Sequence, residues 1–322
     1  MEIKYSKDLI DNEIKKIDFG KKPSELYDPM RFILLNGGKR LRPLLTLYGC
    51  YLFTDNFKKA LKPGIGVEIF HNFTLIHDDI MDQAPLRRGK KTVHEKWNRN
   101  IAILSGDTML IKAYDYLLDV DESLVKKIIS LFNRCAIQVC EGQQYDMNFE
   151  SQKEITEQQY LDMIHQKTAT LLGFSLQLGS LIGGAKDSNA NLLRDFGLAL
   201  GTGFQLKDDL LDVYGDSEKF GKQVGGDIQA NKKTFLLIQA LSHASTAQRE
   251  TIEFWLLQEE PPTEKVKRVT EVYDQIGVRK LTQSKIDEYF RAGFALLDQV
   301  ECDSQKKQTL VNFAKTLINR KS

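Results

Sequence analysis

Two short acidic motifs of the same pattern are the residues of this chain best suited to chemistry. Residues 78–82 read DDIMD and residues 208–212 read DDLLD, so both follow the pattern D-D-x-x-D within apolar segments of helical period. On a helix, positions i and i+4 share a face, so the first and last aspartates of each motif project in one direction. Like charges placed there destabilise a helix by roughly a few tenths of a kcal/mol per pair. Bound cations would offset that cost.

Carboxylate oxygens are suited to hard cations, and magnesium binds through one or two carboxylates, several waters and substrate phosphates. We therefore interpret the two motifs as rows of carboxylates that hold a metal-bridged diphosphate between them. For either motif alone, a solvated helix face is an equally good interpretation. Repetition of the same spacing with apolar flanks favours the binding site.

Two clusters of basic residues accompany the acidic motifs. Residues 37–43 read GGKRLRP, and residues 87–91 read RRGKK and follow the first acidic motif after a short segment. Arginine presents a planar fork to phosphate and lysine acts as a point charge, while glycine lets the backbone approach an anion closely. Each cluster alone is also consistent with a solvated run of charge. Adjacent acids and bases indicate a second diphosphate beside the metal-bound one.

The elements that position these motifs are predicted to be helices. All seven prolines lie outside residues 86–260, and apolar residues recur at helical spacing in several segments. These segments are 66–82, 124–139, 191–214, 248–258 and 281–299. Neither alternating strands nor a strand–helix alternation can be recognised, whereas Gly, Pro, Asp and Ser clusters predict loops, among them 54–64 and 84–92. We expect an all-α fold with residues 1–322 as a single domain.

The composition of the chain indicates which kinds of partner and which cellular location to expect. Hydrophobic residues make up 42% of the chain and charged residues 28%, with a net charge of +1. This balance gives no support for a nucleic-acid partner. No signal sequence or apolar stretch long enough for stable membrane insertion is recognised, and the four cysteines lack metal-binding or disulfide spacing. A cytoplasmic location is expected.

The motifs together resemble the trans-isoprenyl diphosphate synthase, or polyprenyl synthetase, family. The resemblance rests on blocks that keep their order over most of the chain. They are G-G-K-x-x-R-P at 37–43, H-D-D-x-x-D at 77–82, R-R-G at 87–89, Q-x-x-D-D-x-x-D at 205–212, G-K at 221–222 and G-G-D-I-x-x-N-K at 225–232. It implies a bundle of long helices around a deep central cavity, a homodimer, and magnesium as cofactor, with manganese as a substitute.

The resemblance also implies roles for individual residues. The metal-binding positions, which the first motif dominates, are Asp78, Asp79, Asp82, Asp208, Asp209 and Asp212. The positions that hold isopentenyl diphosphate are Lys39, Arg42, His71 and Arg88. Those around the allylic diphosphate and the developing cation are Arg87, Lys167, Thr168, Gln205, Lys222 and Lys232. For His71 a role in the core or at the surface is the alternative, and the Lys167-Thr168 pair is common in any helix.

The implied reaction joins isopentenyl diphosphate to dimethylallyl, geranyl or farnesyl diphosphate in isoprenoid biosynthesis, by ionisation, alkylation and proton loss. Product length is expected to depend on Phe73 and Thr74, which precede Asp78 by five and four residues and lie about 6–8 Å deeper along one helix. An aromatic residue there resembles short-chain enzymes, and ordinary core packing is the alternative role of Phe73. We expect a farnesyl- or geranylgeranyl-length product, with a lean to the latter.

Three other functions share part of this pattern. A class I terpene cyclase also ionises a diphosphate over D-D-x-x-D, but it needs no second diphosphate site. A non-catalytic subunit of a heteromeric synthase usually loses one acidic motif, and both are present here. The His77-Asp78 pair is similar to that of metal-dependent phosphohydrolases, but the other histidines show no ligand pattern. The prenyltransferase is therefore favoured.

Overall fold

The computed structural model describes residues 6–215, 225–258 and 261–318, and nearly all regular structure in these ranges is helical. The all-α prediction is confirmed. The first half contains α1 (Ser6–Ile14), α2 (Ser24–Leu35), α3 (Leu41–Tyr51), the 3₁₀ turn η2 (Phe57–Ala60), α4 (Leu61–Met81), α5 (Val93–Lys96), α6 (Arg99–Leu117) and α7 (Glu122–Ser151). The second half contains α8 (Glu157–Ile164), the π-helical segment η3 (His165–Ala169), α9 (Thr170–Gly183), α10 (Asp187–Tyr214), α12 (Gly226–Gln229), α13 (Phe235–His243), α14 (Thr246–Leu256), α15 (Pro262–Ile276), α16 (Val278–Asp298) and α17 (Ser304–Ile318).

Two of the predicted loops are corrected by the structure. Residues 61–64 belong to α4, because Pro63 lies in the first helical turn, where its missing N–H has no intrahelical acceptor in any case. The segment 84–92 contains a hairpin of β1 (Leu86–Arg87) and β2 (Lys90–Lys91), which are the only strands in the described ranges. Its two-residue turn, Arg88-Gly89, has positive φ at both positions, as a type I′ hairpin requires.

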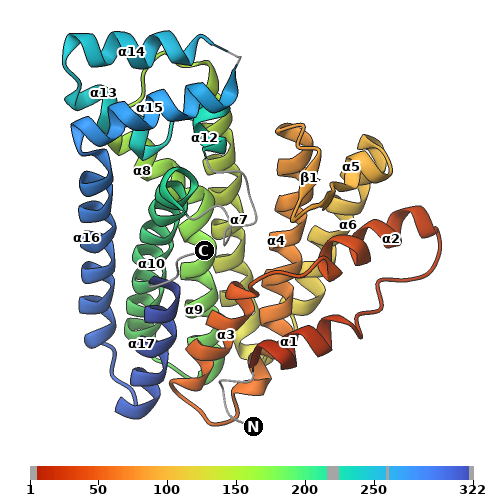
Figure 1. Ribbon diagram of the computed structural model, residues 1–322. Helices are drawn as coiled ribbons and strands as arrows, with labels where there is room; N and C mark the ends of the chain where they lie inside the picture. The colour runs from red at the N-terminus through yellow and green to blue at the C-terminus, as the bar shows by residue number, and fades with distance from the viewer. Residues whose placement is uncertain (1–5, 216–224, 259–260, 319–322) are drawn as a thin grey trace. The chain divides into compact units, whose positions relative to one another are not determined.

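The described residues group into two compact units, so the prediction of a single domain stays a prediction. Unit 1 consists of Met1–Cys135, Leu171–Arg194 and Val300–Lys307, and unit 2 of Ala136–Thr170, Asp195–Gln299 and Gln308–Ser322. In unit 1, α4 and α6 lie side by side, and α3 packs against α9 (Figure 1). The α3–α9 contact requires Gly179, because a Cβ at this position would lie 1.9 Å from the carbonyl oxygen of Thr46.

In unit 2, α16 packs along α10, and α13, α14 and α15 contact one another (Figure 1). A Cβ on Gly203 would lie 2.7 Å from the ring of Phe290, so a glycine at this position lets α10 and α16 approach closely. Two helices of this unit begin with a capping box. Thr156 and Gln159 cap α8, and Ser245 and Gln248 cap α14.

Candidate active site

The first acidic motif lies at the carboxyl end of α4, and its three aspartates differ in exposure. Asp79 is buried at 1% exposure, Asp78 is partly exposed and Asp82 is exposed. Arg87, on β1, donates from Nε to both carboxylate oxygens of Asp79, at 2.8 and 2.9 Å. Asp79 therefore holds the hairpin arginine. Asp78 and Asp82, the pair at i and i+4, are the more exposed carboxylates of the motif.

The hairpin also brings the two basic clusters of unit 1 together. Arg88, at the hairpin turn, donates to the carbonyl of Gly37, and its guanidinium would lie 3.1 Å from a Cβ on Gly38. Both glycines have positive φ, 78° and 142°. The side-chain amide of Asn36 donates to the carbonyl of Arg87 at 3.3 Å. The glycines of the first cluster thus serve as the backbone surface on which Arg88 rests.

Arg40 and Arg42 have different roles at the amino end of α3. Arg40 is buried at 3% exposure and bonds Glu68 at 3.0 Å, Asp11 at 2.9 Å and the carbonyl of Leu34 at 2.7 Å. It is therefore a structural residue. Arg42 lies in the first turn of α3, and its buried Nε has no hydrogen-bond partner among the described residues. Burial lowers its pKa to about 10, and it remains the guanidinium available to an anion.

His71 lies within the same group of bases. Burial lowers its pKa well below the usual value, and the positive charges of Arg42 and Arg88 lower it further. The imidazole is therefore neutral near pH 7. Lys39, just before the helix, is exposed. The structure thus places Lys39 and Arg42 at one helix start, with Arg88 and His71 near Arg42.

Phe73, on α4, is buried at 8% exposure and belongs to a cluster of aromatic rings in unit 1. Its ring centroid lies 4.7 Å from that of His77 and 5.6 Å from that of Phe70. Phe70 in turn stacks edge-on with Phe132 at 5.0 Å. The hydroxyl of Thr74 donates to the carbonyl of His71 at 2.8 Å. Phe73 is thus backed by further aromatic side chains.

The second acidic motif lies on α10 in unit 2, and its aspartates differ in exposure in the same way. Its middle aspartate, Asp209, is buried at 4% exposure, whereas Asp208 and Asp212 are partly exposed. Asp209 accepts from the Tyr160 hydroxyl, and from the Gln205 amide at 3.0 Å. Burial, with the neighbouring charge of Asp227, raises the pKa of Asp209 to about 7.

Lys167 and Thr168 lie in the π-helical segment η3, also in unit 2. Lys167 forms an ion pair with Asp146 at 2.6 Å, and the Thr168 hydroxyl donates to the side-chain carbonyl of Gln205 at 3.2 Å. Gly142, on α7, permits this arrangement, because a Cβ there would lie 2.3 Å from the backbone nitrogen of Lys167. Such π-helical segments widen a helix locally and occur frequently at functional sites.

The block at 225–232 lies against the end of the second motif. The backbone N–H of Asp227 donates to the Asp212 carboxylate at 2.9 Å, and that of Gly225 to the Asp212 carbonyl at 2.7 Å. Lys232 is exposed three residues beyond α12. Lys222, also predicted to bind the allylic diphosphate, lies outside the described residues.

The donor set suits magnesium, because the partly exposed aspartates of both motifs offer carboxylate oxygens. No three His, Cys, Asp or Glu side chains are already gathered into a metal site in the described part of the chain. These carboxylates therefore suit an ion that takes its other ligands from water and phosphate.

Sequence reasoning did not single out four residues that contact the predicted site. They are Asp146, Tyr160, Asp227 and Gly142, which contact Lys167, Asp209 and Asp212. Asp227 could have been found, because it lies within the G-G-D-I-x-x-N-K block. The others carry no local signal.

Comparison with known proteins places this chain in a family. The polyprenyl synthetase family model matches residues 23–276. The chain belongs to the polyprenyl synthetase family. A geranylgeranyl pyrophosphate synthase from Geoglobus acetivorans is 35% identical over 99% of this chain and 98% of its own. A geranylgeranyl diphosphate synthase from Sulfolobus acidocaldarius is 42% identical over 71% of each chain.

Solved structures agree with this assignment. A crystal structure of a geranylgeranyl pyrophosphate synthase has a TM-score of 0.94 and 40% identity, with 100% of both chains covered. A geranylgeranyl pyrophosphate synthase from Corynebacterium glutamicum, solved with isoprenyl diphosphate and magnesium, has a TM-score of 0.89 and 26% identity over 99% of this chain and 100% of its own. The predicted family and the predicted trans-prenyltransferase class are confirmed, and the cyclase and the non-catalytic subunit are not favoured.

Proposed function

We propose that this polyprenyl synthetase condenses isopentenyl diphosphate with an allylic diphosphate to give a geranylgeranyl-length trans-prenyl diphosphate. The proposal rests on the difference in burial among the aspartates, which is the same in both motifs. In each, the middle aspartate is buried and bonded within the protein, while the outer two are more exposed. The more exposed outer carboxylates supply the oxygen ligands that magnesium prefers when it binds a diphosphate.

In this proposal Asp78, Asp82, Asp208 and Asp212 would hold the metal ions of the allylic diphosphate. Magnesium, when bound, supplies positive charge to the leaving diphosphate oxygens. Asp79 and Asp209 are positioning residues, because they orient Arg87 and the Tyr160–Gln205 pair. Arg87, Lys167, Lys222 and Lys232 stabilise negative charge on the leaving group.

Isopentenyl diphosphate binds to the bases of unit 1. Lys39 and Arg42 lie at the amino end of α3, where the helix dipole favours an anion, and Arg88 rests on the adjacent glycine backbone. The neutral imidazole of His71 contributes a hydrogen bond. Fixing this substrate beside the allylic carbon converts a bimolecular step into an effectively intramolecular one, worth on the order of 7–11 kcal/mol at best.

The remaining residues protect and shape the intermediate. Ionisation of the allylic substrate leaves a carbocation, toward which Gln205 and the Lys167–Thr168 backbone present oxygen atoms. Apolar walls exclude water, which would quench the cation. The departing diphosphate accepts the final proton, so the chain needs no dedicated base. Phe73 limits the growing chain, with Thr74 beside it.

A homodimer and a cytoplasmic location are further parts of the proposal. On α6 and its C-cap, the large apolar residues Leu104, Ile111 and Leu118 are exposed by 57%, 64% and 46%. Their spacing of seven residues forms one apolar stripe along the helix, a pattern typical of helix–helix association. No helix in the described ranges is both long and apolar enough to cross a membrane.

A product assay tests the proposed reaction. The purified chain is incubated with labelled isopentenyl diphosphate and each allylic primer in turn, with magnesium present or withheld. We expect a linear geranylgeranyl-length diphosphate that forms only with magnesium. A cyclic hydrocarbon formed from the allylic primer alone, or the absence of any product, would contradict the proposal.

A further inference from the structure

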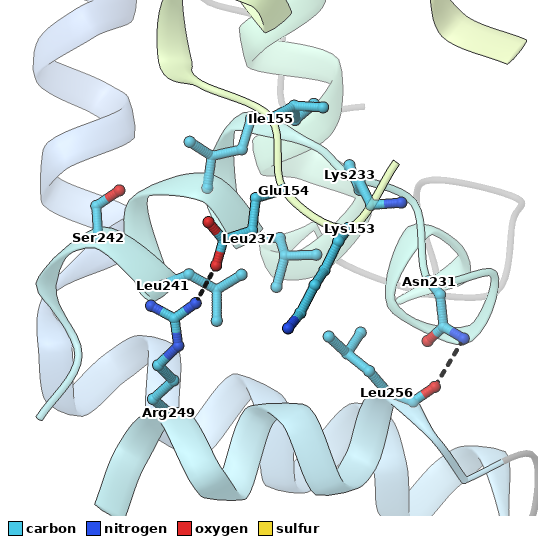
Figure 2. A pocket seen from close by; sticks show the side chains of 11 residues that line it. Lys153, Glu154, Ile155, Asn231, Lys233, Leu237, Leu241, Ser242, Arg249 and Leu256 are labelled. Carbon is cyan, nitrogen blue, oxygen red and sulfur yellow. Dashed lines mark hydrogen bonds and ion pairs between the residues drawn. The ribbon is translucent and has the colours of Figure 1, made fainter. Parts of the chain in front are cut away.

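Unit 2 contains a cavity of about 280 Å³ that is lined by none of the predicted catalytic residues. Four segments form it: the link between α7 and α8, the segment 231–233, helix α13 and helix α14 (Figure 2). Its volume lies near the lower end of the roughly 300–1,000 Å³ typical of small-molecule sites. A ligand of this cavity is therefore small.

The apolar part of the lining comes from side chains of three of these segments. They are Ile155, Leu237, Ile238, Leu241 and Leu256. Leu237 and Ile238 are buried at 5% and 6% exposure. A hydrocarbon chain bound here would bury its own apolar surface and that of the lining. Such burial is favourable by about 25 cal/mol per Å².

The charged residues around the cavity comprise three cations and one carboxylate, and two of the cations already have partners. Arg249 bonds Glu154, which neutralises the carboxylate, and it also bonds Glu253 at 2.9 Å. The ammonium of Lys233 donates to the carbonyls of Phe149 and Glu150 at the end of α7, at 2.6 and 3.0 Å. Both therefore hold the walls together.

Lys153 is different. It makes no hydrogen bond or ion pair with any residue that the structure describes, and Figure 2 shows its ammonium nitrogen pointing into the pocket between Leu256 and the Arg249–Glu154 pair. An uncommitted cation beside an apolar wall suits a molecule with an acidic head and a hydrocarbon body.

We propose that this cavity is a second, non-catalytic site for an anionic amphiphile, with a phosphate head on Lys153 and a short hydrocarbon chain against the leucine and isoleucine wall. Prenyl phosphates and other acidic lipids share this chemistry. The choice of a prenyl chain as the natural occupant rests on the proposed function, whereas the site itself does not.

The cavity shares a segment with the predicted active site. Lys232 lies between two lining residues, Asn231 and Lys233. Asn231 has φ of 53°, and its amide donates to the carbonyl of Leu256 at 2.9 Å, so it ties this segment to α14. A molecule bound in the cavity would therefore contact Asn231 and Lys233, the two neighbours of Lys232, which is predicted to bind the allylic diphosphate.

Methyl NMR on the full chain tests the site without catalysis. Isoleucine and leucine methyl groups are labelled, and n-decyl phosphate is added in the presence of EDTA and without isopentenyl diphosphate. We expect saturable shifts of the Ile155, Ile238 and Leu241 methyl signals. Decanol and inorganic phosphate, which each lack half of the ligand, should bind at least about tenfold more weakly.

Two variants and a control locate the contacts. Lys153→Gln should weaken binding by about tenfold or more, and Leu241→Trp should fill the cavity and abolish the shifts while Lys153 is retained. Lys280→Gln, at an exposed lysine of α16 outside the cavity, should bind as the original chain does. Unchanged methyl signals, or equal affinity in the Lys153→Gln variant, would overturn the proposal.

Geranyl phosphate, which matches decyl phosphate in head group and carbon number, decides the source of the ligand. Tighter binding of geranyl phosphate by about tenfold supports an isoprenoid occupant, and equal binding supports acidic lipids in general. Because this test involves neither magnesium nor turnover, its failure would leave the proposed reaction untouched. A failed product assay would likewise leave the cavity untouched.

Discussion

Arg87 and Asp79 form an ion pair with three contacts in which the arginine Nε lies 2.8 and 2.9 Å from the two carboxylate oxygens and Nη2 lies 2.7 Å from one of them. The pair joins the hairpin to the end of α4. Because Asp79 is buried at 1% exposure, its negative charge depends on Arg87 for compensation. A residue of the acidic motif therefore stabilises the fold before any metal binds.

This relationship predicts different effects for two neighbouring aspartates. Asp79→Asn should lower the metal-free free energy of unfolding by up to about 3 kcal/mol, because Arg87 loses its compensating charge. Asp78→Asn, at a partly exposed position, should lower metal-free stability less than Asp79→Asn does but raise the magnesium concentration for half-maximal activity at least about tenfold. Urea unfolding in EDTA and a magnesium titration of the activity measure the two effects. If both changes lowered the metal-free stability equally, Asp78 and Asp79 would not have these different roles.

The glycines below Arg88 give a second matched comparison. Gly37 and Gly38 both have positive φ, so alanine introduces backbone strain at either position. A Cβ on Gly38 would also lie 3.1 Å from the Arg88 guanidinium, whereas one on Gly37 meets nothing within 4 Å. Gly38→Ala should therefore raise KM for isopentenyl diphosphate several-fold more than Gly37→Ala does. KM values that change equally would show that Arg88 does not depend on this surface.

His71 provides a prediction on pH. Because its pKa in the folded protein lies well below the ordinary 6.5, the unfolded chain binds more protons between that folded value and pH 6.5. Its contribution to stability is complete above pH 6.5 and is lost as the pH falls toward the folded value. Replacement by asparagine should therefore reduce the loss of stability between pH 6.5 and 5. A proton NMR titration of His71 with a midpoint at or above 6.5 would contradict the prediction.

Phe73 offers a test of product length. Phe73→Ala should lengthen the products, because it removes a ring from the path proposed for the growing chain. Phe57→Ala is the control, since it opens a cavity at a similarly buried phenylalanine of η2 and costs about 3–5 kcal/mol by the same mechanism. The control should leave product length unchanged. If the two variants gave the same product distribution, Phe73 would have only a packing role.

The helical fold and the acidic motifs could be predicted from the sequence, because both depend on the spacing of residues close together in the chain. The period of apolar residues correctly located α4, α7, α10, α14 and α16. Helix starts were less certain. Pro63 suggested a loop, but within the first helical turn a proline removes no intrahelical hydrogen bond.

The contacts within the site could not be predicted, because they join residues far apart in the chain. Tyr160 reaches Asp209 across 49 positions, and Lys167 pairs with Asp146 across 21. The π-helical segment at 165–169 depends on the absence of a side chain at Gly142. Arg40 and Arg42 look alike in sequence, and only burial with Glu68 and Asp11 distinguishes the structural one.

Anomalous diffraction from crystals grown with manganese and a non-ionisable allylic thiodiphosphate tests the central proposal most directly. We predict metal peaks at the carboxylates of Asp78, Asp82, Asp208 and Asp212 around one bound thiodiphosphate, with Asp79 still bonded to Arg87. Metal bound at only one motif, or a diphosphate bound away from both, would contradict it.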